Sequence, residues 1–114
     1  MRVLLCGEKD ECETLKKLLI SLPFEISYIL TADDYEEIHN LIVDTQPAVA
    51  IVCDNGAKGM ESIYRIRDSS DIPVIWFSDD KNFAVHSYRL GCSYFGVKPI
   101  EVESLKKAIS ALSI

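Results

Sequence analysis

The chain has 114 residues, of which 48% are hydrophobic and 26% charged, and these values exclude two separate cores and a disordered chain. Its 12 Lys and Arg residues against 18 Asp and Glu residues give a formal net charge of −6. This negative surplus disfavours direct binding to nucleic acid or to an anionic membrane surface, so we expect neither.

The first apolar run, Arg2 to Cys6, predicts a strand and is followed at once by the charged residues Glu8, Lys9 and Asp10. Neither a signal-peptide core nor a membrane span fits before these charges. We therefore expect a cytoplasmic protein with one domain over residues 1–114.

Two helices and a second strand are predicted next. Asp10 with Glu13 resembles a capping pair that begins a helix, and Phe24 to Leu30 predicts a strand. Asp33 or Asp34 is expected to cap the second helix. The two helices carry apolar residues at helical spacing, which are Cys12, Leu15, Leu19 and Leu22 in the first and Tyr35, Ile38 and Ile42 in the second.

Three further strands follow. Val49 to Cys53 and Pro73 to Phe77 are apolar almost throughout, as expected of parallel strands covered on both faces. Asp80 precedes a helix that ends near Gly91, and Tyr94 to Val97 predicts the fifth strand. Two more helices are predicted from the apolar residues Met60, Ile63 and Ile66, and Val102, Leu105, Ile109 and Leu112.

Five strands alternating with five helices predict an α/β fold, a doubly wound parallel sheet, because parallel neighbours need crossover helices that cover both faces. Ligands of such sheets bind where the strands end at their carboxyl side. The residues that directly follow strands are Gly7, Glu8, Asp54, Ser78, Asp79, Asp80, Lys98 and Pro99.

These residue types favour a site for a metal ion and an anion. Glu8 and Asp54 carry the oxygen ligands that Mg²⁺ prefers. Lys98 is expected to pair with a carboxylate or a phosphoryl oxygen, and Ser78 offers a hydroxyl at the same edge.

Two segments resemble motifs of one family. Asp71 to Ser78 and Gly91 to Pro99 are similar to the fourth-strand hydroxyl motif and the fifth-strand Lys-Pro motif of response-regulator receiver domains of two-component signalling. The resemblance covers essentially the whole chain and implies the flavodoxin-like, CheY-like strand order 2-1-3-4-5. Asn82 to Gly91 further resembles receivers that precede LytTR-type DNA-binding domains.

The resemblance implies that Asp54 is a phosphoacceptor, which takes a phosphoryl group from a histidine kinase. Mg²⁺ would be held by Glu8, Asp54 and the backbone carbonyl of Gly56. Ser78 and Lys98 would contact the phosphoryl group. The chain would then be no enzyme beyond self-catalysed phosphotransfer and autodephosphorylation.

The resemblance also implies a switch. Ser78 and Phe95 would move together and remodel the face formed by the fourth helix, fifth strand and fifth helix. That face would bind an output domain, a partner protein or a second copy of the chain, with transcriptional regulation as the expected outcome. A cis peptide bond before Pro99 is part of the same pattern.

Glu8, Asp54, Ser78 and Lys98 favour a phosphorylated receiver, whereas three departures from the family pattern favour the alternative, a degenerate receiver that binds partners without phosphate. Gly7 replaces an acidic residue, so metal affinity is expected to be reduced unless Asp10, Asp79 or Asp80 restores a ligand. Asp79 replaces a small residue and is expected to repel phosphate and compete for Lys98. Residues 55–59 replace the usual Met-Pro loop and are expected to be flexible.

Two adjacent residues are candidates for the position of the phosphoacceptor. Counting from Pro47 places Cys53 there, whereas counting back from Gly59 places Asp54 there, and we favour Asp54 because an acyl phosphate needs a carboxylate. A flavodoxin-like cofactor binder is disfavoured, because residues 7–11 carry too many carboxylates for a phosphate loop.

The cysteines indicate neither a zinc site nor a disulfide framework, because they form no C-x-x-C pair. Cys6 and Cys53 end neighbouring strands, so their thiols are expected to approach each other, with packing as the favoured role over redox chemistry. The full set is Cys6, Cys12, Cys53 and Cys92.

Overall fold

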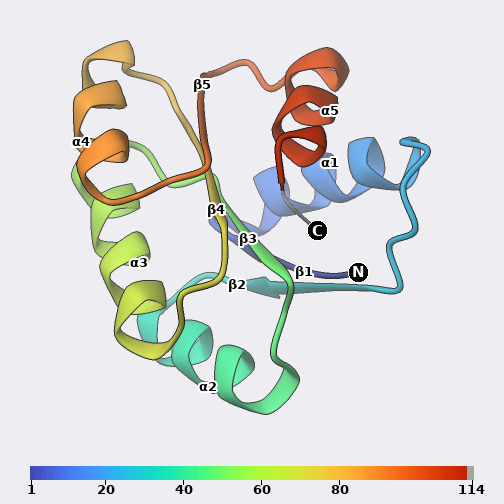
Figure 1. Cartoon of the computed structure of the whole chain (residues 1–114), viewed down its shortest axis with the longest axis horizontal. Coiled ribbons are helices and arrows are strands. Elements are labelled where there is room, and N and C mark those ends of the chain that lie inside the picture. The colour runs from blue at the N-terminus through green and yellow to red at the C-terminus, as the bar shows by residue number, and fades with distance from the viewer. Residues whose placement is uncertain (113–114) are drawn as a thin grey trace.

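A computed structural model describes residues 1–112. These residues form one parallel five-stranded sheet of order β2-β1-β3-β4-β5 and five α-helices, which confirms the predicted α/β fold and strand order (Figure 1). The elements are β1 (Arg2–Cys6), α1 (Lys9–Ile20), β2 (Tyr28–Ala32), α2 (Tyr35–Thr45), β3 (Val49–Val52), α3 (Gly56–Ser69), β4 (Val74–Ser78), the 3₁₀ turn η1 (Lys81–Phe83), α4 (Ala84–Arg89), β5 (Tyr94–Val97) and α5 (Val102–Ser110). No helix within residues 1–112 has the length and apolar character that crossing a membrane requires.

Helices cover both faces of the sheet. α1 and α5 lie on one face, and α2, α3 and α4 lie on the other (Figure 1). β3 lies between the two layers and is buried at all four residues, as its continuous apolar run predicts. Alternate residues of each strand therefore enter different cores, Leu5 and Ile51 on the α1 side and Leu4 and Val52 on the α3 side.

The predicted bounds of the second strand are wrong. β2 covers Tyr28–Ala32 rather than Phe24 to Leu30, because its register with β1 pairs Arg2 with Tyr28 and Cys6 with Ala32. Phe24 and Ile26 pack against the α1-side core from the preceding segment. Their apolar character is therefore explained by core packing rather than by strand pairing.

The starts of the helices differ in part from the prediction. α1 begins at Lys9 with Glu8 as the N-cap residue, and the carboxylate of Glu8 makes no capping bond to the described backbone, so the Asp10 cap is wrong. Asp34 is confirmed as the α2 cap, since its Oδ1 accepts a hydrogen bond of 2.9 Å from the Glu37 amide. Asp80 caps η1 rather than α4, accepting from the Asn82 amide at 2.9 Å.

The predicted flexible loop at residues 55–59 is instead the entry to α3, which begins at Gly56. Gly56 adopts a φ of +53°, which glycine takes without steric cost and which allows the chain to turn directly from Asn55 into the helix. Asn55 Oδ1 accepts a hydrogen bond of 2.9 Å from the Asp79 amide and so connects this turn to the end of β4. Residues 55–59 therefore form a helix start with a side-chain hydrogen bond to the backbone at the end of β4.

Candidate functional site

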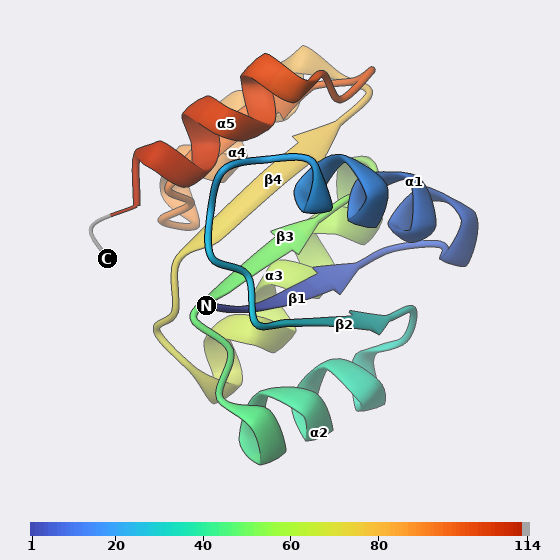
Figure 2. The same ribbon diagram turned by 90° about the vertical axis from the view of Figure 1, so that its right-hand side faces the viewer.

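The carboxyl ends of the strands meet at one edge of the sheet (Figure 2). The last residues of neighbouring strands are paired, Cys6 of β1 with Val52 of β3 and Ser78 of β4 with Val97 of β5. The residues that follow these strands therefore begin at the same end of the sheet. The predicted site residues Glu8, Asp54 and Lys98 therefore lie at the same edge, but their side chains point in different directions.

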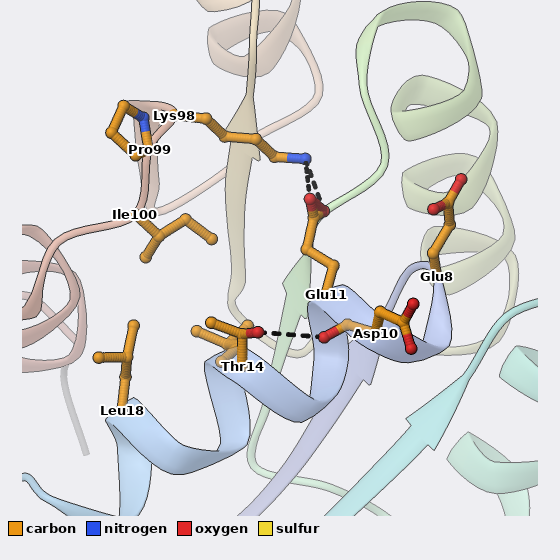
Figure 3. Close-up of a pocket in the computed structure, with 9 residues that line it drawn as sticks. Glu8, Asp10, Glu11, Thr14, Leu18, Lys98, Pro99 and Ile100 are labelled. Carbon is orange, nitrogen blue, oxygen red and sulfur yellow. Dashed lines mark hydrogen bonds and ion pairs between the residues drawn. The ribbon is translucent and has the colours of Figure 1, made fainter.

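Lys98 reaches from the end of β5 to α1. Its Nζ donates hydrogen bonds to Glu11 Oε1 at 2.6 Å and Glu11 Oε2 at 2.9 Å (Figure 3). It also donates a hydrogen bond of 2.5 Å to the Cys53 carbonyl. The side chain of Lys98 is 15% exposed and that of Glu11 is 37% exposed. The peptide bond between Lys98 and Pro99 is cis, as the family resemblance implies.

Asp54 faces α3 on the other side of the sheet. Its Oδ2 accepts a hydrogen bond of 3.1 Å from Ser62 Oγ, and its Oδ1 lies 3.6 Å from Lys58 Nζ. Its carbonyl oxygen accepts a hydrogen bond of 2.9 Å from Trp76 Nε1. Within the described residues, neither a hydrogen bond nor an ion pair joins the Asp54 carboxylate to Lys98.

Cys53 lies on the α1 side, with Cys12 and Leu5 in the same core. A Cβ atom built on Gly7 would lie only 3.1 Å from Cys53 Cβ, so the Cys53 side chain lies directly behind that glycine. Burial raises the pKa of the Cys53 thiol well above its ordinary value, and nearby Lys98 offsets a smaller part of this shift. Of the two residues considered for the acceptor position, Cys53 rather than Asp54 is therefore on the Lys98 side.

The predicted Mg²⁺ ligands do not converge. Glu8 lines the groove that also contains Lys98, whereas Asp54 is bound by α3. Gly56, the third predicted donor, is the first residue of α3. In the part of the chain described, the carboxylate group compact enough for an ion is the exposed set Asp33, Asp34 and Glu37. The donor set predicted for Mg²⁺ thus does not fit this structure.

The residues expected to switch contact the same region from β4 and β5. Ser78 is buried, and its Oγ accepts hydrogen bonds from the Gly56 amide at 3.2 Å and the Asp80 amide at 3.4 Å. The Phe95 ring packs edge-on against Trp76 with centroids 5.4 Å apart. Through Trp76, Phe95 is therefore connected to the backbone of Asp54.

The competitor for Lys98 is Glu11 rather than Asp79. The amide of Asp79 is bonded to Asn55, and among residues 1–112 the carboxylate that pairs with Lys98 belongs to Glu11. Sequence reasoning did not single out Glu11, Ser62 or Trp76. The spacing of eight residues between Asp54 and Ser62 gives a helical position but no indication of a polar contact.

A groove of about 460 Å³ lies between α1 and the segment after β5 (Figure 3). Its charged wall contains Lys98 and three carboxylates, and its floor is apolar. The lining residues are Glu8, Asp10, Glu11, Thr14, Leu15, Leu18, Lys98, Pro99 and Ile100.

The Ser62→Ala substitution is expected to lower the free energy of unfolding by about 1–3 kcal/mol, because it removes a hydrogen bond from an almost buried carboxylate. Asp54 is 7% exposed, so water has little access to replace the lost donor. Urea unfolding measures the change, with Ser110→Ala, an exposed serine on α5, as the control. Equal stability of the two variants would contradict the role of the Ser62 hydrogen bond.

Comparisons with known proteins identify the fold. Neither a family model nor a curated protein matches the sequence. Among solved structures, the N-terminal signal receiver domain of a two-component system response regulator from Bacteroides fragilis has a TM-score of 0.82 and 22% identity, over 99% of this chain and 97% of that one.

Two further solved structures are similar to this chain over most of its length. A two-component response regulator of the LuxR family from Aurantimonas sp. SI85-9A1 has a TM-score of 0.79 and 22% identity, over 96% of this chain and 82% of that one. A response regulator receiver protein from Pseudoalteromonas atlantica has a TM-score of 0.79 and 20% identity, over 96% and 94%. The chain therefore has the fold of the receiver domains of two-component response regulators.

Proposed function

We propose that this chain is a receiver-fold signalling module that binds a partner protein without being phosphorylated. One observation carries the proposal: the Lys98 ammonium is bonded to Glu11 and Cys53 on one side of the sheet, while the Asp54 carboxylate is bonded to Ser62 on the other. The two groups that phosphotransfer would use are thus held apart.

Phosphotransfer to a carboxylate needs cations beside the incoming phosphoryl group, because charge must be offset as the new bond forms. The predicted metal ligands Glu8 and Asp54 do not face each other, and the third donor, the Gly56 carbonyl, lies within α3. Gly7 adds no carboxylate. These features support a role that depends on surface contacts rather than on phosphoryl chemistry.

The surface for such contacts is the face of α4, β5 and α5. Tyr88 on α4 is 85% exposed, and α4, β5 and α5 each carry a further exposed large apolar side chain. Aromatic side chains are enriched in protein–protein interfaces. The exposed set is Val85, Tyr88, Val97 and Val102. We propose an output domain, a partner protein or a second copy as its occupant in the cytoplasm, and the LytTR-type context remains a prediction.

Phosphorylation of Asp54 by a histidine kinase is the second candidate function. It is favoured by the position of Asp54 at the ligand-binding edge of the sheet and by Lys58, whose ammonium lies 3.6 Å from Oδ1. In this case Lys58 and Mg²⁺, rather than Lys98, would offset the charge of the incoming group. The two candidates predict opposite results in one experiment.

Purified chain is incubated with a small-molecule phosphodonor at low and high Mg²⁺, and the intact mass is recorded at neutral pH. We expect no mass increase in the wild type, because Lys58 is the one cation beside Asp54 among residues 1–112. A phosphorylatable receiver treated in parallel shows that the donor is active. Addition of one phosphoryl group to the wild type and its loss in Asp54→Asn would overturn the proposal and establish the second candidate.

A further inference from the structure

The Lys98 site already contains an anion, and that anion is part of the chain. We propose that Glu11 is an internal ligand of Lys98, which occupies the ammonium group that an outside anion such as phosphate would otherwise bind. This inference rests on the proposed function and gives its cause. The Lys98 ammonium group is thus neutralised by a carboxylate of the same chain rather than by a phosphoryl group.

Oxygen atoms of the chain itself surround the ammonium group of Lys98. A lysine ammonium has three N–H donors, and here three oxygens lie within hydrogen-bond distance, two from the Glu11 carboxylate and one from the Cys53 carbonyl. Only 15% of the Lys98 side chain is exposed. An anion that arrives from solution must therefore displace the Glu11 carboxylate to approach the ammonium group closely.

The contact is specific to Glu11. Three carboxylates line the groove, and of these Glu11 is the one that pairs with Lys98 in the described part of the chain, whereas Glu8 and Asp10 do not (Figure 3). A general excess of negative charge in the groove does not explain this pairing. Asp10 therefore offers a control for the loss of one negative charge from the same groove.

The pair connects segments that are distant in the sequence. Glu11 lies in the first turn of α1, and Lys98 follows β5, 87 residues later. An ion pair with both carboxylate oxygens engaged and one partner largely buried is stronger than an exposed pair. The contact consequently holds α1 against the segment after β5 and keeps Lys98 away from Asp54.

The test titrates inorganic phosphate, without divalent cations, into ¹⁵N-labelled wild type, Glu11→Gln, Asp10→Asn and the double variant Glu11→Gln with Lys98→Met. Amide shifts of Lys98 and Cys53 report binding, and the remaining spectrum reports folding. Removing a full charge next to an ammonium is expected to tighten phosphate binding by about tenfold or more in Glu11→Gln. Asp10→Asn is expected to stay within about twofold of wild type, because a charge farther from Lys98 is screened by solvent.

The double variant is expected to lose the added affinity, because it lacks the ammonium group. Equal affinities in Glu11→Gln and Asp10→Asn would overturn the inference, as would phosphate binding that persists in the double variant. These outcomes are independent of the proposed function, which fails instead if the wild type accepts a phosphoryl group in the mass experiment. The two proposals are therefore tested separately.

Discussion

Replacing Gly59 by alanine is expected to lower the free energy of unfolding by about 2–4 kcal/mol, although alanine is the better helix former. Gly59 lies in the first turns of α3 and is buried. A Cβ atom at this position would lie 2.5 Å from Trp76 Nε1 and in direct overlap with the Asp54 carbonyl oxygen. Both of these atoms are parts of the packed core, so neither can move away easily.

The reason for this close approach is the hydrogen bond between Trp76 and Asp54. Trp76 is fully buried, and its Nε1 donates to the Asp54 carbonyl at 2.9 Å across the face of Gly59. A methyl group would either break this bond or push α3 away from the sheet. Breaking the bond leaves a buried polar group without a partner, and displacing α3 opens a gap in the core.

Urea unfolding of Gly59→Ala against Glu61→Ala tests this prediction. Glu61 is exposed on the same helix, so its replacement by alanine is expected to change stability by no more than about 0.5 kcal/mol. Intrinsic helix propensity alone would make Gly59→Ala more stable by about 1 kcal/mol. A stabilised Gly59→Ala variant would therefore contradict the contact geometry.

The fold was predictable from sequence because the strands of a doubly wound sheet are short apolar runs between helical patterns. β3 illustrates this, since Val49–Val52 is apolar at every position and buried at every position. The bounds of β2 could not be predicted from apolar residues alone. Its bounds depend on pairing with β1, and the apolar residues Phe24 and Ile26 belong to the core without belonging to the strand.

The site was predictable only as a set of residues at one edge. A strand turns successive side chains to opposite faces, so a difference of one residue decides which helix layer a side chain contacts. Cys53 enters the α1 side, and Asp54 is bonded to Ser62 on α3. The partner of Lys98 was not predictable, because Glu11 is brought to it by the packing of α1 and by nothing in its sequence neighbourhood.

The buried thiols of Cys6, Cys12 and Cys53 are expected to lower the free energy of unfolding by a total of roughly 3 kcal/mol or more between pH 8 and pH 10, because they resist ionisation in the folded state. Burial raises the pKa of Cys12 from its ordinary value of 9.0 to about 11, and burial raises the pKa of Cys6 and of Cys53 further. Near pH 10 the unfolded chain has released these protons while the folded chain retains them. Stability therefore declines as pH rises, by roughly 1 kcal/mol or more for each thiol at pH 10.

Urea unfolding of wild type and Cys12→Ala at pH 7.5, 9 and 10 isolates this effect, since lysine and tyrosine titrations are common to both proteins. Cys12 is 1% exposed, so Cys12→Ala is expected to be less stable than wild type at pH 7.5. That deficit is expected to shrink by roughly 1 kcal/mol at pH 10, because the variant has no thiol at this position whose folded-state contribution is lost. Curves that stay parallel across the pH range would show that the Cys12 thiol titrates alike in the folded and unfolded chains.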